Sequence, residues 1–279
     1  MILTAENYYS IEADREYFSV SQVKRFLECE EAALDELQNP AQEEKTEALL
    51  VGGYVDAYFA GEMERFRVDN PDIFKRDGTL KAAFRKAEEI IERIEADELS
   101  MLMLGGEKQS ILTGYIEGIP FKIKPDILLS REQADEIANR YADMYGMMWR
   151  GGAIVDLKIM RDFEPMYRAE EGRLSFIEYW RYDLQMSVYQ EIVRQKTGLQ
   201  LPCYILAATK QDPPGLALVE VEQTMLDFNL EWLRQRIKRY ADVKAGREEA
   251  DACGTCARCR RARKLRGPSV FVDGRLLLN

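Results

Sequence analysis

Two short polar segments, each next to an apolar run, constrain this chain more than any other feature. They are Lys124-Pro125-Asp126 and Asp156-Leu157-Lys158. Because strand side chains alternate between faces, Asp156 and Lys158 are expected to project together while Leu157 points away. Placing a carboxylate and an ammonium in an apolar strand is costly unless both have a function. The pattern therefore predicts binding of a hard divalent cation and activation of water beside a phosphodiester.

The composition limits the chemistry that this site can use. The 279 residues include no histidine, which excludes Ser-His-Asp and Cys-His catalysis and zinc sites built on imidazole. Any hydrolysis must therefore use carboxylates, lysine and metal. The net charge of −10 argues weakly against a nucleic-acid partner. Residues 253–266, however, contain six Arg or Lys residues and no acid, so the C-terminal segment forms a basic island.

Cysteine usage and hydropathy indicate the compartment. Five cysteines, an odd number with three of them clustered, favour a reducing environment over a disulfide framework. No apolar run is long enough to span a membrane, and the first residues do not resemble a signal peptide. We expect a cytoplasmic protein with one domain over 1–248 and a basic, cysteine-bearing tail over 249–279.

The order of apolar periodicities predicts helices, then strands, then helices. A helix is expected to begin at Ser19, and two more to cover 46–65 and 81–94. Residues 113–123 predict a hairpin that turns at Glu117-Gly118. Residues 131–150 are expected to be a helical insertion between adjacent strands. The remaining expected elements are a helix over 176–196 closed by Gly198, strands over 202–208 and 217–221, and a helix over 224–243. The fold class is α/β, of α+β type, with a central mixed sheet of about five strands flanked by helices.

This order, with those residues in it, resembles the PD-(D/E)xK nuclease superfamily, in particular its RecB-like and phage RecE-like exonuclease branch. The resemblance implies a restriction-endonuclease-like core in which Asp126 is the first acid and Asp156 with Lys158 forms the (D/E)xK pair. It matches Gln185 and Tyr189 to the Gln-x-x-x-Tyr signature, whose residues share one helix face. Asp56 stands where that family usually has histidine, in Gly52-Gly53-Tyr54-Val55-Asp56.

The resemblance also implies roles for these residues. Asp126 and Asp156 would hold Mg²⁺ or Mn²⁺, with the backbone carbonyl of Leu157 and the carboxylate of Asp56 as further ligands. Lys158 would orient or deprotonate the attacking water and stabilise the transition state. Gln185 would position the water or the metal shell, and Tyr189 would contact the DNA backbone.

The implied activity is a metal-dependent DNA nuclease, and specifically an exonuclease acting on double-stranded ends in phage-type recombination. The implied partner is a single-strand annealing protein, and homo-oligomers occur among such enzymes. Two alternatives from the sequence are a catalytically weak DNA-end binding or scaffold module, and a hydrolase of a small phosphorylated molecule. The second is less favoured, because the sequence contains no glycine-rich phosphate loop. Lys122 and Lys124 share the face of Asp126, where they either touch phosphate or line a solvated strand.

The clustered cysteines form a separate candidate site. Cys253, Cys256 and Cys259 are spaced for metal ligation, but a closed site needs four ligands. Some RecB-like nucleases join an N-terminal helix to a C-terminal cysteine cluster through an iron–sulfur centre, and the resemblance makes Cys29 the fourth ligand here. Either [4Fe–4S] or Zn²⁺ suits four thiolates, and the alternative is reduced free cysteines. Cys203, on an apolar strand, is expected to lie in the core.

Overall fold

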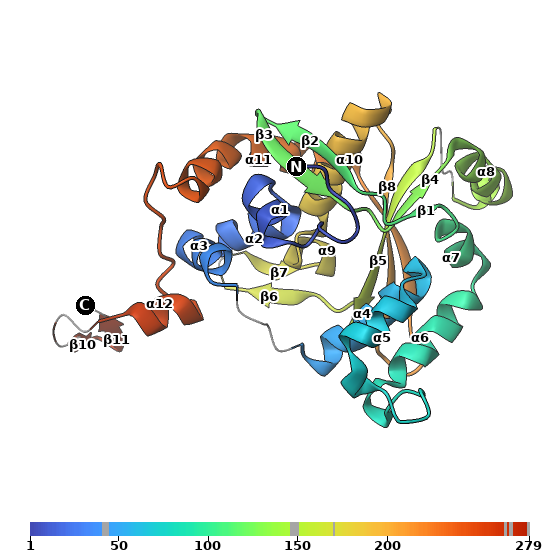
Figure 1. The fold of residues 1–279 in the computed structure, drawn as a ribbon, viewed down its shortest axis with the longest axis horizontal. Helices are drawn as coiled ribbons and strands as arrows, with labels where there is room; N and C mark the ends of the chain where they lie inside the picture. Colours follow the sequence, from blue (N-terminus) through green and yellow to red (C-terminus); the bar gives the residue numbers. More distant parts are fainter. Residues whose placement is uncertain (41–44, 146–150, 170, 265–266, 268–269, 278–279) are drawn as a thin grey trace.

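The computed structural model describes residues 1–279 apart from 41–44, 146–150, 170, 265–266, 268–269 and 278–279. Its centre is a five-stranded sheet with the order β1-β4-β5-β8-β9 (Figure 1). These strands are β1 (Glu107–Lys108), β4 (Ile127–Leu129), β5 (Ala153–Met160), β8 (Cys203–Thr209) and β9 (Leu216–Val221). Strands β5 and β8 run parallel, and the other neighbours run antiparallel. The predicted mixed sheet of five strands is therefore confirmed.

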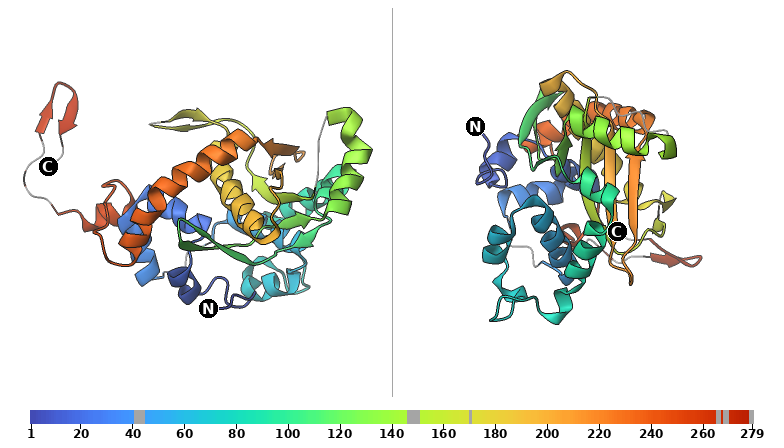
Figure 2. Two further views of the ribbon diagram at one scale, coloured as in Figure 1. Left: turned by 90° about the horizontal axis from the view of Figure 1, so that it is seen from above. Right: turned by 90° about the vertical axis from the view of Figure 1, so that its right-hand side faces the viewer.

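Helices cover both faces of the sheet (Figure 2). Those before it are α1 (Ile11–Glu16), α2 (Val20–Glu28), α3 (Glu30–Gln38), α4 (Glu47–Ala60), α5 (Met63–Asp69), η1 (Pro71–Ile73), η2 (Ala82–Phe84), α6 (Lys86–Glu95) and α7 (Glu98–Met103). Those after its first strands are α8 (Arg131–Tyr145), α9 (Phe176–Tyr179), α10 (Tyr182–Thr197), α11 (Gln223–Lys244) and α12 (Ala257–Ala262). Three hairpins complete the fold: β2 (Leu112–Ile116) with β3 (Ile119–Ile123), β6 (Met166–Arg168) with β7 (Gly172–Leu174), and β10 (Val270–Val272) with β11 (Arg275–Leu277).

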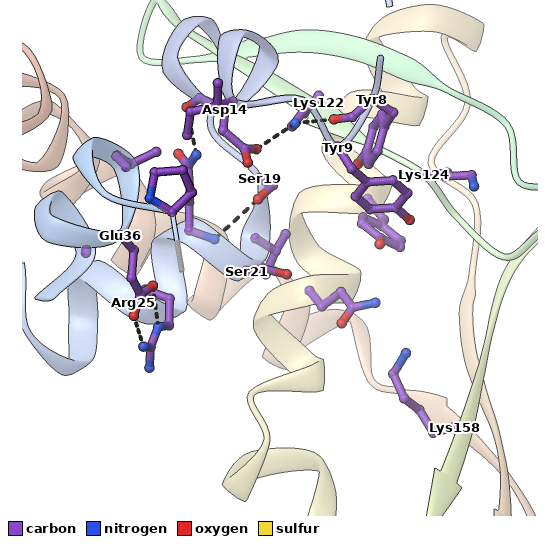
Figure 3. Close-up of a pocket in the computed structure, with 18 residues that line it drawn as sticks. Tyr8, Tyr9, Asp14, Ser19, Ser21, Arg25, Glu36, Lys122, Lys124 and Lys158 are labelled. Carbon is purple, nitrogen blue, oxygen red and sulfur yellow. Dashed lines mark hydrogen bonds and ion pairs between the residues drawn. The ribbon is translucent and has the colours of Figure 1, made fainter. Parts of the chain in front are cut away.

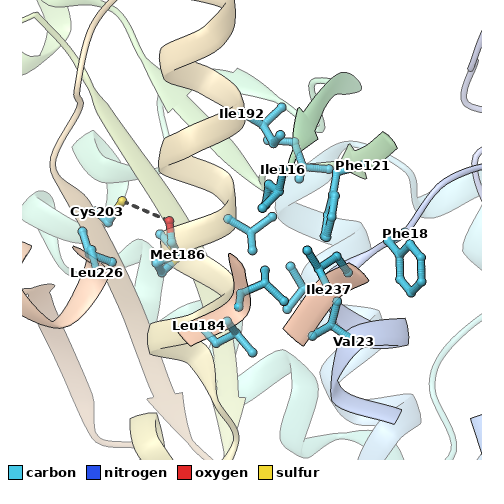
Figure 4. Packing of buried hydrophobic residues seen from close by; sticks show 14 of the residues in the cluster. Phe18, Val23, Ile116, Phe121, Leu184, Met186, Ile192, Cys203, Leu226 and Ile237 are labelled. Atoms are coloured by element: carbon cyan, nitrogen blue, oxygen red, sulfur yellow. Dashed lines mark hydrogen bonds between the residues drawn. The ribbon is translucent and has the colours of Figure 1, made fainter. Parts of the chain in front are cut away.

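The alternation of side chains along β5 and β8 divides the core into two layers. Ile154, Cys203 and Ile205 pack with α2, α10 and α11 on one face (Figure 4). Val155 and Tyr204 pack with α4 and α6 on the other. Cys203 is buried and donates through Sγ to the carbonyl of Met186, which confirms its predicted place in the core. Apolar burial on both faces fixes the register of β5 and hence the direction of each of its polar side chains.

The predicted hairpin forms, but it is not part of the central sheet. Strands β2 and β3 pair with each other, and Glu117 and Gly118 at the turn have φ values of 50° and 75°. Two positive φ angles in a two-residue loop match the twist of the flanking strands, and glycine adopts them without steric cost. The central sheet instead uses β1 and β4. These strands have two and three residues, which is too short for a period-2 pattern to be visible in the sequence.

Three predicted helices differ in extent from those in the structure. The helix expected over 46–65 ends at Ala60, where Gly61 takes a left-handed conformation, and α5 follows. The helix expected over 81–94 is divided into η2 and α6. The helix expected over 176–196 is broken at Arg181, whose φ is 52° and whose guanidinium pairs with Glu171 in the β6–β7 loop. The predicted C-cap at Gly198 is confirmed.

The segment over 131–150 is helical as α8 and connects the adjacent strands β4 and β5; its last part, 146–150, lies outside the described residues. At the other end of the chain, α12 lies beside α3, and the β10–β11 hairpin projects away from the rest of the molecule (Figures 1 and 2). In the part of the chain that the structure describes, no helix combines the length and the apolarity that a membrane span requires.

Candidate active site and cysteine cluster

The candidate active site begins where β4 stops pairing with β5. The last paired residues are Ile127 and Val155. Beyond these residues, the side chain of Asp126 replaces the backbone of β4 as the hydrogen-bond acceptor for β5. Its Oδ2 accepts a hydrogen bond from the backbone N–H of Leu157 at 3.0 Å. Its Oδ1 accepts from Nε2 of Gln109 at 3.0 Å. Asp126 is therefore fixed against β5 by the backbone itself.

The pleat of β5 places Asp156 and Lys158 on the same face, as the sequence predicted. Asp156 is 2% exposed and forms an ion pair through Oδ2 with Nζ of Lys158. Its Oδ1 accepts a hydrogen bond from Nε2 of Gln185 at 2.8 Å. Within the described structure, Oδ2 of Asp156 receives no hydrogen bond. Its negative charge is balanced by the ion pair with Lys158.

Helix α10 supplies the next wall of the site. Gln185 and Tyr189 lie one turn apart and both line the same cavity beside Lys158. Burial raises the pKa of Tyr189 well above the ordinary tyrosine value. One turn earlier, the ring of Tyr182 lies beneath Lys158, with Nζ 5.1 Å from the ring centroid.

Asp56, on α4, completes a group of three carboxylates. It lines one cavity together with Asp126 and another together with Leu157 and Lys158. Its side chain is accessible from the cleft but surrounded by protein, and this desolvation, followed by the charge of Asp126, raises its pKa to about 8. Burial and then the charge of Asp156 raise the pKa of Asp126 to about 6. In both shifts burial is the larger cause, and repulsion between neighbouring carboxylates adds to it.

The three carboxylates and the Leu157 carbonyl fit a hard divalent cation. They offer only oxygen ligands, as Mg²⁺ and Mn²⁺ prefer. A cation would offset the repulsion that raises the pKa values of Asp56 and Asp126. It would also supply a partner for Oδ2 of Asp156, which lacks a hydrogen bond. The donor set present therefore suits the predicted metal.

Cavities open on both sides of Lys158. One, of about 470 Å³, is lined by Tyr9, Lys124 and Lys158 (Figure 3). The other, of about 580 Å³, is lined by Trp180 and Lys210 together with Lys158. Tyr9 is 66% exposed and Trp180 is 48% exposed. The site is thus the middle of a longer cleft with an accessible aromatic side chain on each side.

Of the two lysines of β3 and its following loop, Lys124 borders the cleft, whereas Lys122 is buried. Lys122 is 2% exposed, pairs with Asp14 at 2.7 Å and donates to the carbonyl of Tyr8. It therefore does not line a solvated strand, and its two partners anchor the N-terminal segment. Lys124 is also buried, lies 3.5 Å from Glu62, and borders the cleft (Figure 3).

Sequence reasoning missed three residues of this site. Tyr182 could have been found, because it precedes Gln185 by one turn on the predicted helix. Gln109 lies in a loop next to β1, and its contact with Asp126 depends on a strand pairing that has no sequence signal. Lys24, on α2, lies with Nζ 5.1 Å from the centroid of the Tyr182 ring. A lysine on an amphipathic helix is normally solvated, so its pattern gave no indication of this position.

The structure brings the four predicted cysteines together at the other end of α2. The Sγ atoms of Cys29, Cys253, Cys256 and Cys259 all lie within 4.8 Å of one another. Two of the separations are 3.6 Å, between Cys29 and Cys259, and 4.0 Å, between Cys253 and Cys259. Cys29 has an extended backbone conformation that separates α2 from α3. Helix α2 ends there, and the side chain of Cys29 contacts Cys259 of the tail.

Backbone groups and ion pairs support this cluster. The N–H of Cys256 donates to Sγ of Cys253 at 3.3 Å, and the N–H of Cys259 donates to Sγ of Cys256 at 3.4 Å. Hydrogen bonds from the backbone of Thr255 and Cys256 lower the pKa of Cys253 to about 6. The guanidinium of Arg239 also binds Glu30 through two nitrogens, at 2.9 and 2.8 Å, beside the cluster. Four adjacent sulfur donors suit a thiophilic metal.

Comparisons with a family model and with solved structures both give matches. Residues 19–135 and 142–262 match the family described as a PDDEXK-like domain of unknown function (DUF3799). A crystal structure of a protein named "putative exonuclease" from Eubacterium rectale is 42% identical in sequence, with a TM-score of 0.81 over 96% of both chains. Among curated proteins, none matches.

Proposed function

The chain belongs to the DUF3799 family of PDDEXK-like domains, and from this premise we propose that it is a metal-dependent DNA exonuclease. The observation that carries the proposal is the juxtaposition of Asp126, Asp156 and Lys158. Two carboxylates from consecutive strands converge where the backbone pairing of those strands ends, and one lysine compensates them. A decayed site that only binds DNA would have no reason to keep this costly group of charges.

The residues of the site divide the work of phosphodiester hydrolysis. Asp126, Asp156, Asp56 and the Leu157 carbonyl would hold Mg²⁺ or Mn²⁺. The divalent cation, when bound, supplies Lewis acidity and neutralises charge that develops on the phosphate. Burial opposes the charged form of Lys158, but Asp156 and Asp126 outweigh it and raise the pKa above the ordinary lysine value. Lys158 therefore acts as an ammonium that orients the attacking water and stabilises the transition state, rather than as a base.

The surroundings favour a nucleic-acid strand over a small phosphorylated molecule. The cleft continues on both sides of Lys158 and carries an accessible aromatic side chain in each direction, Tyr9 and Trp180. Aromatic side chains stack on bases of any identity. The protein named as an exonuclease in the comparison supports cutting from an end.

We extend the proposal to double-stranded ends as the substrate and a single-strand annealing protein as the partner. An exonuclease that degrades one strand of a duplex leaves the other single-stranded, and such a partner would bind it. The expectation of a homo-oligomer belongs to the same proposal.

The function is tested with end-labelled linear duplex and closed circular DNA, each with Mg²⁺, Mn²⁺ or EDTA. We expect metal-dependent loss of linear DNA only, and none with Asp156→Ala. Cleavage of circular DNA would show an endonuclease. If wild type and Asp156→Ala behave alike, with no cutting in either metal, the scaffold alternative replaces the proposal.

For the cysteine cluster we propose a structural metal, either Zn²⁺ or [4Fe–4S], and the spacing favours zinc. Four thiolates at the Zn–S distance of about 2.3 Å lie about 3.8 Å apart in a tetrahedron. The separations of 3.6 and 4.0 Å bracket this value. A four-iron cluster, which places one iron between each thiolate and the core, holds its sulfur ligands farther apart. Elemental analysis of protein purified without oxygen distinguishes one zinc from four iron atoms per chain. The Cys29→Ser variant should lose the same metal.

A further inference from the structure

Lys24 differs from the other lysines of the cleft in having no acceptor. Lys122, Lys124 and Lys158 pair with carboxylates, and Lys210 donates to the carbonyl of Ala48. Among the residues that the structure describes, none forms a hydrogen bond or ion pair with Nζ of Lys24. Its Nζ instead lies 5.1 Å from the centroid of the Tyr182 ring.

The position of Lys24 makes this lack of an acceptor costly. Its side chain is half-buried on α2, which packs against α10. Lys158 lies at the same distance from the same ring. Burial, and then repulsion from Lys158, lower the pKa of Lys24 to about 8. A desolvated ammonium without a partner destabilises the folded protein, so its retention beside the site indicates an anion that arrives with the substrate.

Helix α2 holds this lysine firmly in place. At its N-terminal end, Nζ of Lys244 donates to the carbonyl of Tyr17 at 2.8 Å and to Oε1 of Gln22 at 2.9 Å. Cys29 ends the helix at the cysteine cluster. Ser21 and Gln22, three and two residues before Lys24, line the same cavity as Lys158. The helix therefore holds a positive charge beside the cleft, next to the ring of Tyr182.

We propose that Lys24 binds a phosphate of the DNA strand next to the one that is cut. This inference rests on the proposed nuclease function and adds a substrate contact outside the (D/E)xK residues. Lys24 and Lys158 would share Tyr182 as an apolar floor, with Lys158 at the reacting phosphate and Lys24 at its neighbour. The residue sets the position of the strand and takes no part in proton transfer.

The test measures DNA binding at rising salt in EDTA, with Lys24→Met, Lys24→Arg and the wild type. Lys238→Met is the matched control, because Lys238 is an exposed helix lysine on α11. Loss of one phosphate contact should reduce the slope of log K against log salt by about 1. Lys24→Arg should keep the slope. In Mg²⁺, Lys24→Met should raise KM by about tenfold, the value of one charged hydrogen bond.

Melting temperature and cleavage separate the possible failures. Removing an unpaired charge should leave the melting temperature of Lys24→Met equal to or above that of the wild type, whereas a purely structural lysine would lower it. An unchanged salt slope with intact wild-type cleavage overturns the role of Lys24 alone. A wild type that binds DNA with a Lys24-dependent slope but does not cut overturns the nuclease proposal alone. A wild type that does not bind DNA overturns both.

Discussion

Nε2 of Gln185 donates a hydrogen bond to Oδ1 of Asp156 at 2.8 Å, so that a helix amide fixes the orientation of a buried strand carboxylate. The other oxygen of Asp156 faces Lys158 without a hydrogen bond. The two oxygens therefore have different roles: one is held by the protein, and the other is directed toward the charges of the cleft.

Replacing Gln185 should separate orientation from charge. Gln185→Ala removes the hydrogen bond and should lower activity by about 10- to 100-fold, as is usual for partners of metal ligands. Gln185→Glu keeps the shape but adds a carboxylate next to Asp156, which should raise carboxylate pKa values and move the pH–rate profile to higher pH. Steady-state rates over a pH series measure both effects. Equal profiles for wild type and Gln185→Glu would contradict the assignment.

The acids of the site should be the largest contributors to activity. Asp126→Asn and Asp156→Asn should each lower kcat by about 10³-fold or more, because each removes a proposed metal ligand and a fixed charge. Asp227→Asn, on the exposed side of α11, is the matched control and should retain activity. Isothermal titration with Mn²⁺ measures the accompanying loss of metal affinity. Full metal affinity in both site variants would exclude these ligands.

Lys158→Met should stop catalysis without stopping metal binding. The methionine keeps the length of the side chain and removes the ammonium that pairs with Asp156. Mn²⁺ affinity should stay the same or rise, because a competing positive charge is lost, while kcat falls by about 10²-fold or more. Combined titration and single-turnover cleavage test this. A parallel loss of affinity and rate would assign Lys158 to site assembly instead.

Metal binding should release protons, and its pH dependence follows from the raised pKa values. The pKa of Asp126 is about 6 and that of Asp56 is about 8. A raised carboxyl pKa favours the protonated folded state, so stability without metal should fall as pH rises from about 4 toward these values. A divalent cation binds the ionised forms, so its stabilising effect should grow over the same range.

Thermal unfolding with Mg²⁺ and with EDTA, at pH 6 and pH 8, measures how the stability with and without metal changes with pH. The metal-induced gain should be larger at pH 8. Asp56→Asn should remove most of the change between pH 6 and 8 and leave the dependence at lower pH. A gain that is equal at both pH values would show that Asp56 does not bind the cation.

The cysteine cluster should control the stability of the tail and of α2. Cys29→Ser should abolish metal retention and make residues 249–262 accessible to protease, since Cys29 and the tail cysteines contact each other directly. Cys203→Ser is the control: this cysteine is buried in the core and distant from the cluster in sequence and structure. It should lower stability without loss of metal. Retention of metal by Cys29→Ser would exclude the four-cysteine site.

Local patterns predicted the parts of the site that depend on one element at a time. Strand alternation gave the shared face of Asp156 and Lys158. The family resemblance indicated Gln185 and Tyr189, and helical spacing added only that they share one helix face. Contacts between elements were not accessible in this way. Gln109 reaches Asp126 only because the two-residue strand β1 pairs with β4, and Lys122 is buried only because the N-terminal segment carries Asp14 to it.

The same distinction applies to the fold. The longer strands of the central sheet, β5, β8 and β9, correspond to the apolar runs of the sequence, and a long helix between β5 and β8 is typical of the parallel pair that they form. The identity of the outer strands does not, because β4 has three residues and the clearer alternation lies in the separate β2–β3 hairpin. The break at Arg181 coincides with an ion pair to Glu171 from the β6–β7 loop, a contact that no helical period encodes.

The contact between Cys29 and Cys259 has a consequence for the order in which this chain folds. The two residues are 230 positions apart, so α2 gains its C-terminal anchor only after residue 259 has been synthesised. Contacts of such long sequence separation form late, because the intervening chain must first be ordered. A nascent chain will therefore carry Asp126, Asp156 and Lys158 well before the helix that bears Lys24 is secured, and the proposed nuclease reaches its working form only once Cys259 has joined Cys29.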